Sequence, residues 1–132
     1  MRVLIFGSNG QLGQDLTGQS RSRGWECVGA DLPACDITRF DHIEDAFTRA
    51  GRVDAVINAA AYTAVDAAES NAGIAFAVNR DAVTLLAQAC ARRGLPLIHV
   101  STDYVFDGLK TNAYLPDDPV NPQGVYGRSK AE

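Results

Sequence analysis

The C-terminal stretch of the sequence places a tyrosine and a lysine four residues apart, as Tyr126 and Lys130. Positions four apart share one face of a helix, so the ammonium of Lys130 can lie near the phenol of Tyr126. A neighbouring cation stabilises a phenolate, and a phenol tuned in this way can pass a proton to or from a reacting oxygen. The hydroxyl of Thr102, in the cluster Ser101-Thr102-Asp103, is a candidate to hydrogen-bond the same oxygen. These residues are predicted to be catalytic, although a tyrosine and a lysine at this spacing also arise by chance.

A second group of residues suited to binding is the Gly-x-x-Gly-x-x-Gly pattern at positions 7–13. It follows a short apolar run and precedes a helical pattern. In that context Gly7 permits a tight turn, Gly10 leaves room for a pyrophosphate, and Gly13 lets the helix pack closely. The helix N-terminus then offers free N–H groups to phosphate. A purely structural turn is the alternative interpretation.

Acidic residues follow at the distance that a dinucleotide site requires. Asp31 comes 18 residues after Gly13, where a carboxylate accepts hydrogen bonds from the adenosine ribose. Such a carboxylate favours NADH over NADPH, because a 2′-phosphate would face a negative charge. Asp36 and Ile37 lie in the next short loop, where a carboxylate could meet the adenine amino group. A solvated loop aspartate is the alternative for Asp31.

Small residues occupy positions 58–63, Asn-Ala-Ala-Ala-Tyr-Thr, directly after a third apolar run. Side chains of this size let the backbone pass close beside a bound cofactor. Tight packing between a helix and a sheet explains the alanines almost as well. Asn79 falls in the middle of the next helical pattern, where we expect it to hydrogen-bond nearby backbone.

The elements that must position these residues alternate between short apolar runs and helical patterns. The patterns predict strands at 3–6, 25–30, 53–57 and 97–100, and helices at 11–22, 40–50, from 70 or 71 to about 91, and from 125. The inward face of the third helix is predicted to carry Phe76, Val83, Leu86 and Ala87. Glycine, proline and asparagine signals place residues 107–124 in a loop.

Strands separated by helices form right-handed crossovers and a parallel sheet. The predicted fold class is therefore α/β, a Rossmann-type doubly wound parallel sheet that is incomplete at its C-terminal end. The expected strand order is 3-2-1-4, with the switch point between the first and fourth strands. Ligands bind such sheets at the carboxyl ends of the strands, where both the Gly7 turn and the 101–103 cluster would lie.

Composition sets broad limits on the kind of protein. The 132 residues are 46% hydrophobic and 21% charged, as in a single globular domain covering residues 1–132. The net charge of −4 argues against nucleic-acid and anionic-membrane surfaces. The apolar start is too short for a signal peptide or a membrane span, so a cytoplasmic location is expected. Cys27, Cys35 and Cys90 lack metal or redox spacing and are expected to be reduced.

Together these motifs resemble the extended short-chain dehydrogenase/reductases. The resemblance rests on the glycine pattern, on a Ser/Thr after the fourth strand, and on Tyr126-x-x-x-Lys130. Within that group, three blocks are similar to the dTDP-4-dehydrorhamnose reductase family. They are Asn58-Ala-Ala-Ala-Tyr-Thr-Ala-Val-Asp66 with Glu69, Ser101-Thr-Asp-Tyr-Val-Phe-Asp-Gly108, and Pro119-Val-Asn-Pro-Gln-Gly-Val-Tyr-Gly-Arg-Ser-Lys130.

The resemblance implies a nicotinamide cofactor, NADH or NADPH, and admits a Mg²⁺ requirement and a homodimer. No residue is assigned to a metal. The residues implied to contact the cofactor are Gly7, Gly10, Gln11, Leu12 and Gly13 at the pyrophosphate, Asp31, Asp36 and Ile37 at the adenosine, Ala61, Tyr62 and Thr63 along its length, and Tyr126 and Lys130 at the nicotinamide end.

The resemblance also implies a reaction, the reduction of the C4 ketone of dTDP-4-dehydro-L-rhamnose to dTDP-L-rhamnose. Tyr126 would donate the proton, Lys130 would bind the nicotinamide ribose, and Thr102 and Asp103 would contact the sugar. Members of that family are longer and carry further strands and a substrate domain. Residues 1–132 would then be the cofactor-binding part, and by themselves are expected not to turn over substrate.

Two other functions stay open at this point. The regulatory subunit of methionine adenosyltransferase also resembles this family, so the fold can serve as a non-catalytic nucleotide- or partner-binding module. A dinucleotide-binding fragment without activity is the third interpretation. The joint presence of Thr102, Tyr126 and Lys130 favours the enzyme, because a binding module does not need all of them.

Overall fold

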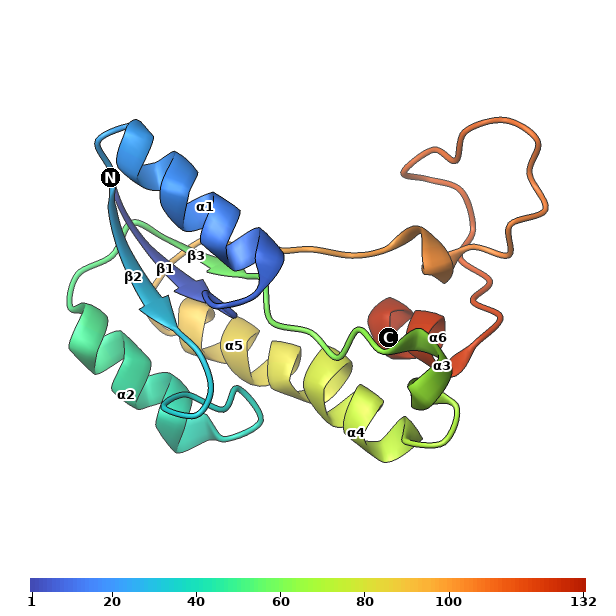
Figure 1. Cartoon of the computed structure of the whole chain (residues 1–132), viewed down its shortest axis with the longest axis horizontal. Helices are drawn as coiled ribbons and strands as arrows, with labels where there is room; N and C mark the ends of the chain where they lie inside the picture. Colours follow the sequence, from blue (N-terminus) through green and yellow to red (C-terminus); the bar gives the residue numbers. More distant parts are fainter.

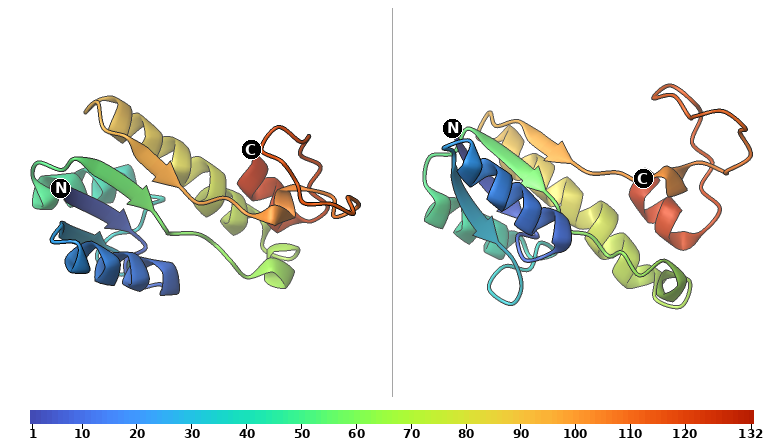
Figure 2. Two further views of the ribbon diagram at one scale, coloured as in Figure 1. Left: turned by 90° about the horizontal axis from the view of Figure 1, so that it is seen from above. Right: turned by 45° about the horizontal axis from the view of Figure 1, so that its top comes forward.

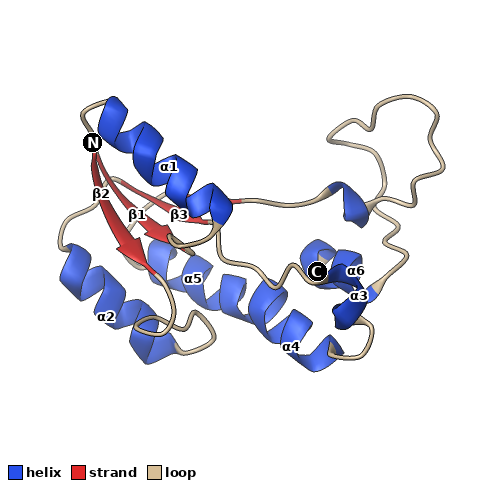
Figure 3. Ribbon diagram, in the orientation of Figure 1, coloured by secondary structure: helices blue, strands red, loops and turns tan.

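A computed structural model describes the whole chain from Met1 to Glu132 as a parallel sheet with helices on both faces (Figures 1 and 3). The strands are β1 (Arg2–Phe6), β2 (Glu26–Ala30), β3 (Ala55–Asn58) and β4 (Leu97–His99). The α-helices are α1 (Gln11–Ser22), α2 (Phe40–Ala50), α3 (Val65–Ala68), α4 (Ala72–Phe76), α5 (Ala82–Ala91) and α6 (Val125–Ala131). A π-helical turn, η1 (Ala77–Asp81), joins α4 to α5, and a 3-10 turn, η2 (Asp103–Val105), follows β4.

The sheet confirms the predicted α/β class but not the predicted strand order. The strands lie in the order β2-β1-β3-β4, all parallel, so the expected order 3-2-1-4 is wrong. After β2 the chain crosses back past β1 through α2, and β3 pairs with β1 on its other side. A right-handed return of this kind places α2 on the face opposite α1. The switch point therefore lies between β1 and β3, rather than between β1 and the fourth strand.

The central position of β1 follows from its composition. Val3 to Phe6 are almost completely buried, whereas β2 exposes Glu26 and Gly29 at the edge of the sheet. A continuous apolar strand gains most from a neighbour on each side and from helices on each face. At the other edge, β4 pairs only with β3, and Ile98 remains 56% exposed.

Helices cover the two faces of the sheet unequally. Figure 1 shows α1 over one face and α2 with α5 beneath the other, and the views of Figure 2 agree. The main core lies on the α2–α5 side, where alternate strand residues meet both helices. Its members from the sheet and these helices include Leu4, Phe6, Val56, Ile43, Ala46, Phe47, Ala82, Leu86, Ala89 and Cys90.

The predicted third helix is present as one continuous run, α4–η1–α5, beginning at Ala72. Its buried face differs from the predicted one. Leu86 is fully buried as expected, but Phe76 and Val83 are half-buried and Ala87 is exposed. Small residues take most of the inward positions, which lets the helix lie close to the sheet and to α6. The buried residues of this run are Ala75, Asn79, Ala82, Leu86, Ala89 and Cys90.

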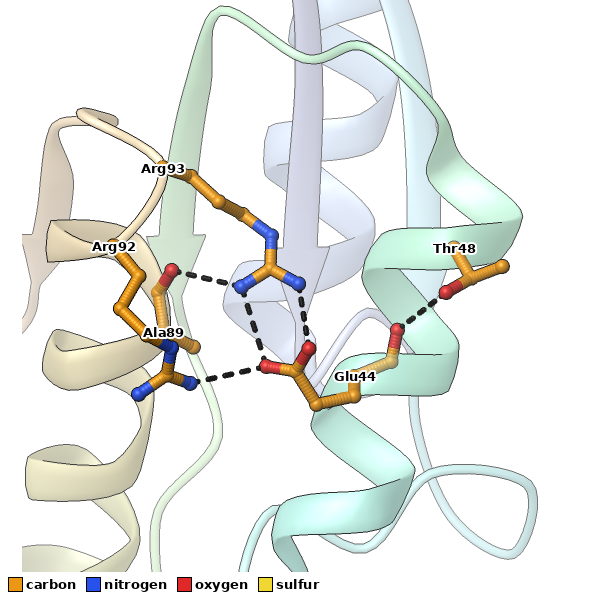
Figure 4. Close-up of polar contacts among 5 residues, drawn as sticks. All are labelled: Glu44, Thr48, Ala89, Arg92 and Arg93. Atoms are coloured by element: carbon orange, nitrogen blue, oxygen red, sulfur yellow. Dashed lines mark hydrogen bonds and ion pairs between the residues drawn. The ribbon is translucent and has the colours of Figure 1, made fainter.

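An ion-pair cluster fixes α2 to the end of α5 (Figure 4). The carboxylate of Glu44 accepts from Arg93 at 2.7 Å and from Arg92 at 3.2 Å. Arg93 also donates to the carbonyl of Ala89 and lies over the ring of Phe47. The three charged groups lie on the surface, where ion pairs add little to the free energy of unfolding. We therefore infer that they mainly fix how the two helices are aligned.

Residues 103–132, together with α3 and α4, form a second, smaller unit beside the sheet (Figures 1 and 2). There α6 packs on α3 and α4 through Ala68, Ala75 and Val125. The predicted loop at 107–124 extends away from the sheet and contains no helix or strand. No helix of the structure combines the length and apolar character needed to cross a membrane.

Candidate active site

The carboxyl ends of the strands are aligned in one row across the sheet. Phe6 of β1 pairs with Ala30 of β2 and with Asn58 of β3, and Asn58 pairs with His99 of β4. The segments that follow these residues therefore leave the sheet at one edge. The sequence-predicted site residues come from those segments and from α6.

The three glycines of the first loop have two different roles. Gly7 has a φ of +77°, and a Cβ there would lie 2.4 Å from the backbone nitrogen of Ala60. A Cβ at Gly13 would lie 2.1 Å from the carbonyl oxygen of Gly7. Both glycines are therefore required by the fold itself. Gly10 differs, because a Cβ there would meet only the Gly7 carbonyl, at an ordinary 3.5 Å.

Two clefts meet beside Gly10. One cleft of about 460 Å³ extends from Gly10 toward Tyr126 and Lys130. A second, of about 410 Å³, extends from Gly10 toward Asp36 and Ile37. The two clefts share Gly10, Ala59, Ala60 and Ala61 in their walls, so they adjoin at the carboxyl edge, and together they are called the trough.

Most of the predicted contact residues line this trough. The half toward α6 is lined by Gly10, Gln11, Leu12, Ala61, Thr63, Tyr126 and Lys130 of the predicted set, and the other half by Gly7, Asp31, Asp36, Ile37 and Tyr62. Gly13 is buried behind the turn and does not line it. The N-terminus of α1, which opens into the trough at Gly10, has neither a side-chain cap nor an acidic residue in its first turn. These features fit an anionic group such as a pyrophosphate.

Asp31 is held against the glycine loop. Its carboxylate accepts from the backbone N–H of Asn9 at 2.7 Å and from that of Leu32 at 2.7 Å. The two oxygens of an ionised carboxylate have room for further donors. The residue therefore supports the loop and still faces the trough.

Asp36 is tied to its own short loop. Its carboxylate accepts from the hydroxyl and the backbone N–H of Thr38. Both hydrogen bonds lower the pKa of the Asp36 carboxyl below its ordinary value. A negative charge is consequently maintained at the far end of the trough.

Asn79 joins three elements around the other half of the trough. Its side chain accepts from the N–H of Tyr62 at 2.8 Å and donates to the Tyr62 carbonyl at 3.0 Å. It also donates to the hydroxyl of Ser129 on α6 at 3.0 Å. The expected hydrogen bond to nearby backbone is therefore wrong, since Tyr62 is 17 residues away. The π-helical turn that contains Asn79 lies where the helix meets both segments.

Tyr126 and Lys130 lie on one face of α6 and line the same half of the trough. The ring of Tyr126 packs edge-on against Tyr104, with centroids 5.6 Å apart. The side-chain nitrogen of Lys130 is hydrogen-bonded at the end of β4 rather than to the phenol. It lies 2.6 Å from the carbonyl oxygen of Val100 and 3.1 Å from Nε2 of His99. Burial lowers the pKa of Lys130 below its ordinary value.

Thr102 and Asp103 lie just outside this trough. The Thr102 hydroxyl accepts from the N–H of Tyr104 at 3.2 Å and donates to Asp103 at 3.3 Å. Both residues line a neighbouring hollow toward Tyr114 and the 107–124 loop, whereas Ser101 lines the trough itself. Contact of these two residues with a sugar stays a prediction.

Several residues of the site were not predicted from sequence. Ser101 stands beside Thr102 in the sequence and has no predicted role. Asn58 lies in the 58–63 motif without a predicted role of its own, and His99 has no recognisable spacing. Glu69 stands beside the Asn58–Asp66 block and has no predicted role. In the structure its carboxylate lies at the first turn of α6 and accepts from the backbone N–H of Val125. No group of three or more His, Cys, Asp or Glu side chains comes together to hold a metal.

Comparison with known proteins agrees with this geometry. A family model described as the RmlD substrate binding domain matches residues 1–132. A dTDP-4-dehydrorhamnose reductase of Mycobacterium tuberculosis (strain CDC 1551 / Oshkosh) is 48% identical over 133 residues, which cover 98% of this chain and 43% of the relative. The chain thus spans less than half the length of that relative.

Solved structures show the same fold. A dTDP-4-dehydrorhamnose reductase from Clostridium acetobutylicum superimposes with a TM-score of 0.91 at 37% identity, over 98% of this chain and 46% of that one. The Bacillus anthracis reductase, determined in complex with NADP, gives a TM-score of 0.91 at 33% identity over the same shares of the two chains. The sheet and its helices therefore have the Rossmann-type arrangement of these reductases.

Proposed function

Because the chain belongs to the RmlD substrate binding domain family, we propose that it is the cofactor-binding part of a dTDP-4-dehydrorhamnose reductase. The reaction is reduction of the C4 ketone of dTDP-4-dehydro-L-rhamnose by NADH or NADPH. One observation carries the proposal. The two adjoining clefts of the trough lead from Asp31, Asp36 and Ile37, past Gly10, to Tyr126 and Lys130.

The trough can be assigned from end to end. The pyrophosphate would lie on the open side of Gly10, at the N–H groups of Gln11 and Leu12 that begin α1. The adenosine would lie toward Asp31, Asp36 and Ile37, and the backbone of Ala61 to Thr63 would run beside the dinucleotide. When bound there, the cofactor supplies the hydride that reduces the ketone.

The residues at the α6 end supply the remaining chemistry. Tyr126 holds the proton that the new alkoxide takes up, and Lys130 binds the nicotinamide ribose. Thr102 and Asp103 would contact the sugar from the adjoining hollow. A module that only binds a partner does not need this set of residues, which favours the enzyme over a regulatory subunit.

Cofactor preference depends on Asp31. A 2′-phosphate beside its carboxylate costs electrostatic energy, so we expect NADH to be preferred or both cofactors to be used. The Bacillus anthracis reductase was crystallised with NADP, so a relative with this fold binds the phosphorylated cofactor. We assign Mg²⁺ no ligands in this chain.

The sugar nucleotide needs more protein than these residues provide. The matched residues make up 43% of the Mycobacterium tuberculosis relative, so more than half of that protein lies outside the match. We assign the NAD(P)-binding domain to residues 1–132 and a substrate domain to the remaining portion. Orientation of reactants between two walls is worth about 7–11 kcal/mol of barrier. We therefore propose that turnover requires the longer protein. We also propose that the enzyme is cytoplasmic, with a homodimer as one assembly.

The test has two parts. Calorimetry of the chain with NADH and with NADPH should show one dinucleotide bound per chain. In the longer protein, oxidation of NAD(P)H should depend on dTDP-4-dehydro-L-rhamnose. Absence of dinucleotide binding in both forms would refute the proposal, and binding without reduction would favour the regulatory alternative.

A further inference from the structure

A chain of four polar groups connects the backbone of the trough to Lys130. The N–H of Ala60 donates to Oδ1 of Asn58 at 3.1 Å. The amide nitrogen Nδ2 of Asn58 lies 3.1 Å from Nδ1 of His99, and Nε2 of His99 lies 3.1 Å from Nζ of Lys130. Asn58 is 1% exposed, so its amide is shielded from bulk water. The Lys130 nitrogen also contacts the Val100 carbonyl at 2.6 Å.

The direction of hydrogen bonding along this chain is set at its backbone end. A backbone N–H can only donate, so the oxygen of the Asn58 amide must face Ala60. The Asn58 amide nitrogen then faces His99 as a donor. Nδ1 of His99 must accept, and a neutral imidazole with an accepting Nδ1 carries its proton on Nε2. That proton points at Lys130.

An ammonium cannot take this position as a partner of His99. An ammonium has three donors and no acceptor, so it would set N–H against N–H. An uncharged amine fits, because its lone pair accepts from His99 while one of its hydrogens is donated to the Val100 carbonyl. We propose that His99 is a positioning residue that docks Lys130 as the neutral amine, so that Lys130 must leave His99 in order to act as a cation.

The surroundings of Lys130 agree with this arrangement. The half of the trough that it lines contains no carboxylate, and Lys130 makes none of the ion pairs of the chain. The other polar side chains that line this half are those of Gln11, Asn58, Thr63, Ser101 and Tyr126. Burial lowers the pKa of Lys130, and burial is also the largest cause that lowers the pKa of His99.

This inference rests on the proposed function only for what Lys130 binds after leaving His99. The tautomer of His99 and the charge of docked Lys130 are properties of the chain without ligand. They can be measured without NADH, NADPH or a sugar nucleotide. Failure of cofactor binding and failure of this inference are therefore separate results.

Nitrogen NMR of the imidazole rings tests the first half. The chain has two histidines, His42 and His99, so each ring can be assigned by substitution. His42 is an internal reference, because its Nδ1 accepts from the N–H of Asp36 at 3.1 Å and its proton is therefore on Nε2. At neutral pH His99 should show the same Nε2–H tautomer. An Nδ1–H tautomer or a doubly protonated His99 would overturn the proposal.

Carbon NMR of the lysine side chains tests the second half. Lys110 and Lys130 are the lysines of the chain, and Lys110, which is paired with Asp118, serves as the reference. In His99→Gln the new amide can present its oxygen to an ammonium. We expect the proton affinity of Lys130 to rise about tenfold or more, which is one unit or more in pKa, and that of Lys110 to stay the same. An unchanged or lower Lys130 proton affinity would contradict the docking.

A reversal of the hydrogen-bond direction gives an independent check. Asn58→Asp offers an acceptor to both Ala60 and His99, so His99 should change to the Nδ1–H tautomer. Its Nε2 would then accept from a charged Lys130, and the His42 tautomer should not change. A folded variant in which His99 retains the Nε2–H tautomer would count against the proposal. If the variant fails to fold, the unsubstituted chain and His99→Gln still decide the question.

Discussion

The carboxylate of Glu69 accepts a hydrogen bond of 2.7 Å from the backbone N–H of Val125, 56 residues later in the sequence. Val125 is the first residue of α6, and Gly124 before it has no side-chain cap of its own. A Cβ at Gly124 would lie 3.0 Å from the same Glu69 oxygen, so glycine makes the approach easy. Glu69 therefore caps the helix that carries Tyr126 and Lys130.

Removal of this cap should loosen α6. Glu69→Ala is expected to cost about 0.5–2 kcal/mol, the range for loss of a helix cap. Hydrogen exchange of the α6 amides should accelerate, whereas exchange in α5 should not. Glu69→Gln retains an acceptor oxygen and should lie between the two. Equal exchange in all three proteins would show that the contact does not hold the helix.

Gly10 and Gly13 should separate binding from folding. The backbone of Gly10 is extended, with φ −70°, and the space beside it is open, so Gly10→Val should fold and lose most of its affinity for NADH. Gly13→Ala places a Cβ 2.1 Å from the Gly7 carbonyl and should lose about 1–3 kcal/mol of stability. Thermal unfolding and calorimetry of both variants distinguish the two effects. Unaltered NADH affinity in Gly10→Val would remove the pyrophosphate from this loop.

A second pair of glycines tests the packing of α6. A Cβ at Gly127 would lie 2.2 Å from the carbonyl oxygen of Tyr104, so Gly127→Ala must push α6 away from η2. We expect a loss of about 1–3 kcal/mol and a changed near-ultraviolet signal from the Tyr104–Tyr126 contact. Gly18, in the middle of α1, has open space, and Gly18→Ala should add about 0.5–1 kcal/mol. Similar effects of the two substitutions would argue against the close approach.

The hydroxyl of Tyr126 should matter for turnover and little for folding. Tyr126→Phe retains the ring that packs against Tyr104. Loss of a general acid typically lowers turnover by about 10²–10⁴-fold. Steady-state kinetics of the longer reductase should show that loss in kcat, with the Kd for NADH nearly constant. A variant with near-normal kcat would assign the proton to another group.

His99 should make stability depend on pH. Burial is the largest cause that lowers the pKa of His99 below its ordinary value of 6.5. Between the ordinary pKa of the unfolded chain and the lowered pKa of the folded chain, the unfolded chain binds more protons. The free energy of unfolding should therefore fall as the pH drops through this range. Urea unfolding at several pH values should show this slope, and His99→Gln should reduce it. The same slope in both proteins would assign the effect to other groups.

The sequence alone determined where the strands and the main helices lie along the chain. Hydrophobic periodicity identified every strand and the main helices within about two residues, because a buried face leaves a regular signal in its own segment. The short helix α3 and the turn η2 were missed, since four or three residues are too few for a period to appear. The glycine pattern predicted the turn correctly, because the positive φ of Gly7 and the approach of Gly13 to the Gly7 carbonyl are set within the loop itself.

The tertiary structure alone decided which segments became neighbours. The position of β3 beside β1 depended on the direction of the crossover through α2, which the composition of the strands does not encode strongly. Asn79 reached Tyr62 and Ser129, Glu69 reached Val125, and Lys130 turned to His99 instead of Tyr126. A periodic pattern reports which face of a segment is buried, but the partner of a polar side chain depends on packing between segments that lie far apart in the chain.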